Sequence, residues 1–252
     1  MIRSVHSAER ASLAGISFGR WLSLARLGAA ILGLPLLLPA AEQPNSALFS
    51  DDFDHDLRQW SVEQVPGGRV FVADGALVIE DVGGSAVWFR SLLTAPVEIS
   101  YEAEVVVRGG PHDRLSDLNC FWMAQDPKQP AGALPVGRSG RFPDYDNLFT
   151  YYVGYGGNNN TTTRFRRYDG TSERPLLPEH DLRDAKFLLV PNHAYQIRIV
   201  VRRDTTEFWR DGAKIFSFTD PHPLTSGYFA FRTVRSHLVI RHFKVSRPVT
   251  AP

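Results

Sequence analysis

The sequence has little of several features that define common protein classes. Its 252 residues include a single cysteine, Cys120, so an internal disulfide and a zinc site built from several cysteines are both excluded. Charges of opposite sign nearly cancel, because 28 Lys and Arg face 27 Asp and Glu, which gives a formal net charge of +1. Without a strong global field we expect no binding to nucleic acid, and any recognition of an anion must be local.

The sequence also lacks a long hydrophobic run, although its first 44 residues differ from the rest. Four arginines precede the segment LGAAILGLPLLLPAAE, which is too short for a comfortable membrane span and ends in small residues. This order is typical of a secretory leader; the alternatives are an uncleaved anchor or a start codon placed too early. We expect a leader over residues 1–44, a single domain over residues 45–252, a periplasmic or extracellular location, and no stable membrane insertion after the leader is removed.

What the remaining sequence does contain is a series of short strands and turns. In RVFVADGALVIED, two runs rich in valine and isoleucine flank Asp74-Gly75, and a second Asp-Gly pair follows at Asp211-Gly212. VEISYEAEVVVR alternates apolar and polar residues, as expected for a strand with one buried face. Residues 109–190 look irregular by comparison and hold most of the clustered polar residues. The pattern predicts an all-β fold, a β-sandwich jelly roll of two antiparallel sheets with long functional loops.

The central stretch TYYVGYGGNNNTTTRFRRYDG predicts a strand, a turn and a returning strand. Alternation places Tyr152 on the face opposite Tyr155 in the first strand. The glycines and asparagines that follow tolerate left-handed backbone geometry, and we expect Asn158 and Asn160 to offer amide groups to a ligand. In the returning strand Arg164 and Arg166 share a face with Tyr168, while Phe165 and Arg167 share the other.

Three segments resemble the start of concanavalin A-like lectin/glucanase jelly rolls: LFSDDFDHDLRQWSVE, GRVFVADGALVIED and VWFRS. The central segments, among them GGPHDRLSDLNCFWMAQDP and RPLLPEHDLRD, are similar to a bacterial YesU-like family associated with polysaccharide utilisation. A more distant likeness is to jelly-roll polysaccharide lyases, in which a strand of the form aromatic-x-x-Gly-x-Tyr brings a tyrosine to the sugar. YYVGYGGN has this form, and the likeness places Tyr155 at the tyrosine position. The arginine-rich and Gln-x-His strands of those lyases are not recognisable here.

These residues favour a protein that acts on an acidic, uronate-containing polysaccharide or its oligosaccharides. Guanidinium groups capture carboxylate or sulfate, and tyrosines stack on sugar rings while offering a hydroxyl. Lyase-type β-elimination needs the uronate charge neutralised and a base and acid at hand. The candidate catalytic residues are Tyr155, Tyr152, His180 and Arg164. The candidate substrate-binding residues are Arg114, Asp117, Asn119, Asp144, Tyr145, Asn158, Asn160, Arg166, Arg167, Glu179 and Arg232.

Three alternatives remain open at this point. A non-catalytic carbohydrate-binding module would use the same tyrosine and arginine contacts. A glycoside hydrolase would need two carboxylates across a cleft, and Asp113, Asp117, Asp144, Asp146, Glu179 and Asp181 are available. A solvated network of ion pairs on a plain hairpin is the structural alternative. We expect no cofactor; DFDHD near residue 53 is the segment in which a structural calcium is an option.

Overall fold

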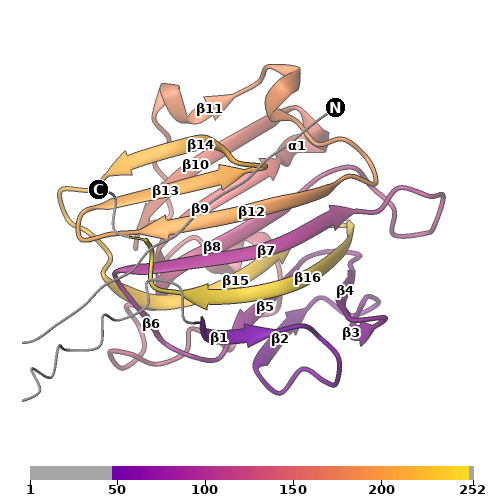
Figure 1. The fold of residues 1–252 in the computed structure, drawn as a ribbon, viewed down its shortest axis with the longest axis horizontal. Helices are drawn as coiled ribbons and strands as arrows, with labels where there is room; N and C mark the ends of the chain where they lie inside the picture. Colours follow the sequence, from indigo (N-terminus) through magenta and orange to yellow (C-terminus); the bar gives the residue numbers. More distant parts are fainter. Residues whose placement is uncertain (1–46, 250–252) are drawn as a thin grey trace, which may run out of the picture. The chain divides into compact units, whose positions relative to one another are not determined.

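The computed structural model describes residues 47–249, so the expected leader over residues 1–44 lies outside the described part of the chain. Within it, two antiparallel sheets of eight strands each stack as two layers (Figure 1). This arrangement confirms the expected β-sandwich jelly roll. Short helical turns lie in the connections: η1 (Phe142–Tyr145), α1 (Gly157–Asn160), η2 (Pro178–His180) and η3 (Ala185–Phe187).

The first sheet carries the strands that lie in front in Figure 1. Seven of its strands form one continuous path, and the eighth, β1 (Ala47–Asp51), pairs with β16. This pairing lies beyond the point at which the register between β16 and β7 shifts. The order of the path is β14 (Ala213–Thr219), β13 (Thr205–Arg210), β12 (Ala194–Val201), β7 (Val97–Val105), β16 (His237–Ser246), β4 (Ala76–Glu80) and β3 (Arg69–Ala73).

The second sheet lies behind the first and carries the central stretch of the sequence. Here β6 (Leu93–Thr94) pairs with β15 off the main path. The order of that path is β11 (Asp181–Leu182), β10 (Thr162–Asp169), β9 (Phe149–Gly156), β8 (Leu118–Gln125), β15 (Ser226–Thr233), β5 (Ser85–Phe89) and β2 (Trp60–Gln64).

Two Asp-Gly turns close the hairpins predicted from the sequence. Asp74 and Gly75 join β3 to β4 with φ values of 52° and 65°. Asp211 and Gly212 join β13 to β14 with φ values of 50° and 78°. Left-handed geometry at both central residues is what a two-residue turn of this kind requires, and it explains why an Asp-Gly pair stands at each position.

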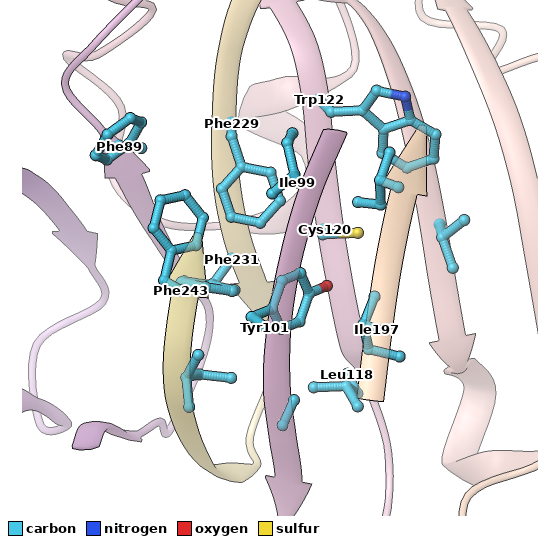
Figure 2. Packing of buried hydrophobic residues seen from close by; sticks show 14 of the residues in the cluster. Phe89, Ile99, Tyr101, Leu118, Cys120, Trp122, Ile197, Phe229, Phe231 and Phe243 are labelled. Carbon is cyan, nitrogen blue, oxygen red and sulfur yellow. The ribbon is translucent and has the colours of Figure 1, made fainter. Parts of the chain in front are cut away.

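A core of aromatic and branched side chains fills the space between the sheets. Phe229, Phe231 and Phe243 pack against one another, and Tyr101 meets Phe231 edge to face at 5.0 Å between ring centroids (Figure 2). Cys120 lies in the same cluster and is fully buried. Burial raises the pKa of its thiol to about 12, so the group is an inert part of the core.

The second sheet is covered on both faces, which distinguishes it from the first. On the face turned away from the core, here called the outer face, Trp88, Phe121, Tyr152 and Tyr168 form a second cluster. Residues 126–148, here called the cover segment, pack onto this cluster. Because both faces of β8 and β9 are apolar, their sequence lacks strict alternation, and residues 109–190 looked irregular although they contain three strands of eight residues.

Candidate functional site

One row of side chains crosses the outer face of the second sheet from strand to strand. Residues directly opposite each other in a sheet share a face, so the register of the strands determines which side chains meet. We call this set the charged row, because it carries one arginine on one side of a glycine and an arginine and an aspartate on the other side. Its members, in order from β5 to β11, are Ala86, Arg232, Asn119, Gly154, Arg164 and Asp181.

A cavity of about 390 Å³ opens over the middle of this row, a size that is typical of small-ligand sites. Gly154 gives the cavity its depth, since no side chain rises from the row at this point. Tyr152 leans over the glycine: its hydroxyl lies 2.9 Å from the place that a Cβ at residue 154 would occupy. We call the cavity the arginine pocket, because its lining includes Arg114, Arg164, Arg166 and Arg174.

Positive charge exceeds negative charge in the arginine pocket. Asp117 is the one carboxylate among the described residues that line it, and it is already paired with Arg114 at 2.9 Å. Arg166 lies opposite Tyr152 in the register of β9 and β10, donates to the carbonyl of Arg174, and forms no ion pair with any residue in 47–249. Burial lowers the pKa of Arg166, which is the direction expected for a half-buried cation without a counter-ion. The pocket therefore favours an anionic ligand.

Arg164 is held in place at the edge of the sheet by Asp181. The pair is bidentate, with Nε to Oδ1 at 2.9 Å and Nη2 to Oδ2 at 3.2 Å. The side-chain hydrogen bond from Arg164 is the largest cause that moves the pKa of Asp181 well below its usual range. Thr162 and Arg183 also donate to this carboxylate. Asp181 thus stays ionised and orients the guanidinium that lines the pocket.

The asparagine turn after β9 positions a second arginine. Asn158, Asn159 and Asn160 all have left-handed backbones, with φ of 53°, 58° and 58°, as the sequence predicted for this turn. The Asn159 side chain accepts from Nε and Nη2 of Arg114 at 3.1 and 2.6 Å. Asn158 lines the pocket, whereas Asn160 bonds both backbone groups of Leu189 and serves the turn itself.

Six of the predicted site residues are brought together by the fold, and the rest lie elsewhere. Tyr152, Arg164, Arg166, Arg114, Asp117 and Asn158 line the arginine pocket. Asn119 and Arg232 lie next to it in the charged row, buried beneath the outer face.

Tyr155 points to the opposite side of the sheet from Tyr152. It is 1% exposed, and its hydroxyl accepts a hydrogen bond from Arg210 at 2.8 Å in the core. Burial raises the pKa of Tyr155 far above its usual range. Strand alternation is the physical reason for this placement: residues 152 and 155 are an odd number of positions apart, so only one can face the pocket. From the core, the Tyr155 hydroxyl cannot reach a ligand on the outer face.

His180 and Arg167 also lie away from the arginine pocket. His180 is packed edge-on against Phe165, whose ring centroid is 4.9 Å away, and burial lowers the pKa of the histidine. Arg167 pairs with Asp220 at 3.1 Å. Glu179, next to His180, is exposed.

Asp144 and Tyr145 belong to the cover segment. Asp144 accepts from the backbone and side chain of Ser139, whose hydroxyl is the main cause of the lowered pKa of this carboxylate. Tyr145 is buried and donates to Glu63. Glu63 was not predicted from the sequence, and neither were Phe142 and Arg174, which both line the pocket. The roles of these residues follow from contacts with the cover segment, between positions that lie far apart in the chain. No local sequence pattern predicts such contacts.

No pair of carboxylates lines the arginine pocket, and no metal centre is found in the described residues. Of the six carboxylates considered for hydrolysis, only Asp117 lines the pocket. Among residues 47–249, no group of three or more His, Cys, Asp or Glu side chains is arranged to hold a metal ion. Asp51, the residue before DFDHD, accepts from the indole of Trp60 at 2.9 Å. No helix of the described residues is long and apolar enough to cross a membrane.

The fold is a jelly-roll β-sandwich similar to that of galectin-like structures. A Bacillus subtilis protein of unknown function with a galectin-like fold has a TM-score of 0.62 at 18% identity, over 80% of this chain and 96% of its own. The Ca²⁺/Man3GlcNAc-bound exoplasmic/lumenal domain of VIP36 scores 0.54 at 12% identity, covering 82% and 92%. The carbohydrate recognition domain of Emp47p scores 0.52 at 14% identity, covering 83% and 100%.

Residues 79–243 match the family described as a domain of unknown function, DUF6250, and the chain belongs to this family. A comparison with curated proteins finds no match. The expected likeness to concanavalin A-type jelly rolls is confirmed at the level of the fold. The narrower likeness to YesU-like proteins stays a prediction.

Proposed function

We propose that the arginine pocket binds the acidic unit of a polysaccharide or of an oligosaccharide derived from it. The observation that carries this proposal is the set of four arginines around a single paired carboxylate, with Arg166 free of any ion pair among the described residues. A guanidinium takes a carboxylate or sulfate with two parallel hydrogen bonds. Tyr152 adds aromatic surface against which a sugar ring can pack.

The fold supports the saccharide part of this proposal. The VIP36 domain was solved with a mannose-containing saccharide, and the Emp47p domain is a carbohydrate recognition domain. Both share the sandwich architecture with this chain, although identities of 12% and 14% carry no residue-level correspondence. We further propose that the protein acts outside the cytoplasm, as the sequence of residues 1–44 predicts.

β-Elimination on a uronate is a second candidate function, favoured by the placement of Tyr152 directly opposite Arg166. Arg166 would neutralise the uronate carboxylate, Asp117 would take the C5 proton, and Tyr152 would protonate the leaving oxygen at C4 as the C4–C5 double bond forms. Burial raises the pKa of Tyr152 well above its usual range, so the phenol stays protonated at neutral pH and does not act as a base. Hydrolysis by paired carboxylates has less support, because the described lining offers Asp117 alone.

The test is a binding titration with oligosaccharides of glucuronate, galacturonate, mannuronate and guluronate beside neutral counterparts of equal length. The same samples are followed by ultraviolet absorbance and by reducing ends. We expect acidic ligands to bind and neutral ones to bind at least tenfold more weakly, with Arg166→Gln removing the difference. Arg69→Gln, at an exposed ion pair on β3, is the matched control.

Each outcome distinguishes the candidates. Equal affinity for neutral and acidic ligands, or an unchanged affinity in Arg166→Gln, would overturn acidic recognition. Absorbance that rises with the native protein and is lost in Tyr152→Phe, while binding is retained, would establish elimination. New reducing ends without a rise in absorbance would indicate hydrolysis. If neither absorbance nor reducing ends increase while the ligand still binds, the protein is a binding protein without activity on these ligands.

A further inference from the structure

Arg232 is a buried cation without a counter-ion among the described residues. It lies in the middle of β15, next to Asn119 in the charged row, and its side chain is 0% exposed. No carboxylate in residues 47–249 forms an ion pair with it. A buried charge of this kind is costly unless hydrogen bonds or an opposite charge compensate it. The hydrogen-bond partners around Arg232 therefore determine whether its role is only structural.

Only one of the two edges of the Arg232 guanidinium is used within the described chain. Nη1 donates to the carbonyl of Ser85 at 2.8 Å and to that of Thr233, which anchors the side chain. Nε and Nη2 are buried and have no hydrogen-bond partner in residues 47–249. These two atoms form the side-on edge of the guanidinium. Arg164, in the same row, uses that edge to hold the carboxylate of Asp181.

Asn119 adds an unpaired acceptor to the same place. Asn119 lies opposite Arg232 in the pairing of β15 with β8, and its Oδ1 is buried without a hydrogen-bond partner in the described structure. Its Nδ2 donates to Asp117, which lines the arginine pocket. Two donors of Arg232 and one acceptor of Asn119 thus lie unsatisfied on neighbouring strands of the charged row, in which Gly154 and Arg164 line the pocket. Each such group costs free energy until a partner arrives.

Phe142 is where the arginine pocket and Arg232 meet. Its ring lines the pocket and lies 5.2 Å from the guanidinium carbon of Arg174, a pocket residue. The same ring lies 5.3 Å from the guanidinium carbon of Arg232. Phe142 begins the short helical turn η1 in the cover segment and is followed by Pro143. Phe142 therefore contacts both the pocket and the Arg232 guanidinium.

We infer that Arg232 and Asn119 form an inner subsite for the carboxylate of a uronate, entered from the arginine pocket when Phe142 moves aside. The inference rests on the proposed function and locates the acidic group within it. The carboxylate would take the Nε and Nη2 donors side-on, and a neighbouring sugar hydroxyl would donate to Asn119. Arg166 then acts at the entrance, and Arg232 provides the final contact.

The experiment titrates glucuronate and galacturonate, with glucose, galactose and sulfate for comparison, into the native protein and three variants. Arg232→Lys keeps the charge and removes the side-on edge, so we expect uronate affinity to fall tenfold to about a hundredfold. Phe142→Ala removes the barrier, so we expect uronate affinity to rise several-fold with no change for the neutral sugars. Arg166→Gln reports on the outer pocket alone.

A dicarbonyl reagent that modifies arginine gives a readout independent of affinity. We expect Arg232 to stay unmodified in the native protein, to react in Phe142→Ala, and to be protected there by glucuronate, each measured by mass spectrometry of peptides. If Arg232→Lys does not fold, Phe142→Ala alone decides: unchanged uronate affinity together with an unreactive Arg232 overturns the subsite.

The two proposals fail in different ways. No uronate binding by the native protein overturns both. Uronate binding that is lost in Arg166→Gln but unchanged in Arg232→Lys and Phe142→Ala overturns the inner subsite and leaves the outer pocket standing. Sulfate that binds as well as the uronates and responds equally to Arg232→Lys would overturn the assignment to a carboxylate.

Discussion

The carboxylate of Glu63 accepts a hydrogen bond from the Tyr145 hydroxyl at 2.9 Å, although the two residues lie 82 positions apart. The same buried carboxylate accepts from the indole of Trp88 at 2.9 Å and from the backbone N–H groups of Gly137 and Arg138, both at 2.6 Å. A single side chain on β2 therefore fastens the cover segment to the outer face of the second sheet. The position of Phe142 over the pocket depends on this attachment.

Glu63→Ala is expected to lower the free energy of unfolding by about 3 kcal/mol, because it leaves several buried donors without an acceptor. The measurement is urea denaturation followed by tryptophan fluorescence. Glu102→Ala removes an acceptor from Gln196 on the surface of the first sheet and is expected to change the free energy by less than about 0.5 kcal/mol. Equal losses in the two variants would contradict the assigned role of Glu63.

Gly154→Ala is expected to damage the pocket more than the fold. The new methyl group would lie 2.9 Å from the Tyr152 hydroxyl, so that side chain must shift into the cavity. We expect acidic saccharide affinity to fall at least tenfold, and the unfolding free energy to fall by about 1 kcal/mol. Gly157→Ala is the matched control for stability, since its methyl group would have no atom nearer than 3.9 Å. Unchanged affinity in Gly154→Ala would show that ligands bind elsewhere.

His180 is expected to make stability depend on pH in the mildly acidic range. Burial lowers its folded pKa below the unfolded value of about 6.5, so the unfolded chain binds more protons between the two values. The stability is fully present above the unfolded value and is lost as pH falls below it. His180→Phe keeps the edge-on packing and removes the titration. The difference between melting temperatures at about pH 7.5 and about pH 5.5 should therefore shrink in this variant.

The control for that comparison is His55→Phe, which removes a histidine from an exposed turn. This variant should retain the full decline of the native protein toward acid. If His180→Phe declines as steeply as the native protein, the buried histidine is not the source of the dependence.

Cys120 is expected to report on global opening of the sandwich. Its thiol is buried, and burial raises its pKa to about 12, so a thiol reagent such as dithionitrobenzoate should not react with the native protein at neutral pH. Reaction should become rapid and stoichiometric in urea, with a midpoint equal to that of unfolding followed by fluorescence. Rapid labelling of the folded protein would mean that the core opens locally around β8.

Local features of the fold could be predicted, and contacts across the sheet could not. Asp74-Gly75 and Asp211-Gly212 specify their turns by backbone preference alone, and alternation correctly separated Tyr152 from Tyr155. Alternation did not reveal which of these two tyrosines faces the pocket, because aromatic residues occupy both faces of β9.

The pocket itself was predictable only in part, for the same reason. The arginines of β10 were visible as a cluster in the sequence, and Asp181, the partner of Arg164, lies on the adjacent strand β11. The burial of Arg232 and the link between Glu63 and Tyr145 depend on pairings between strands that are distant in the chain. A single sequence does not encode such pairings in any local pattern.

The charged row also makes the pocket sensitive to errors of strand alignment. Each of its members comes from a different strand, so a slip of one residue in β15 would turn Arg232 from the outer face into the apolar layer between the sheets. The charged residues thus discriminate against misaligned forms of the sheet, since these would bury a guanidinium among aromatic rings. A ligand held by the row would add its binding free energy only to the correctly aligned form. It would therefore stabilise the correct strand register across the whole sheet.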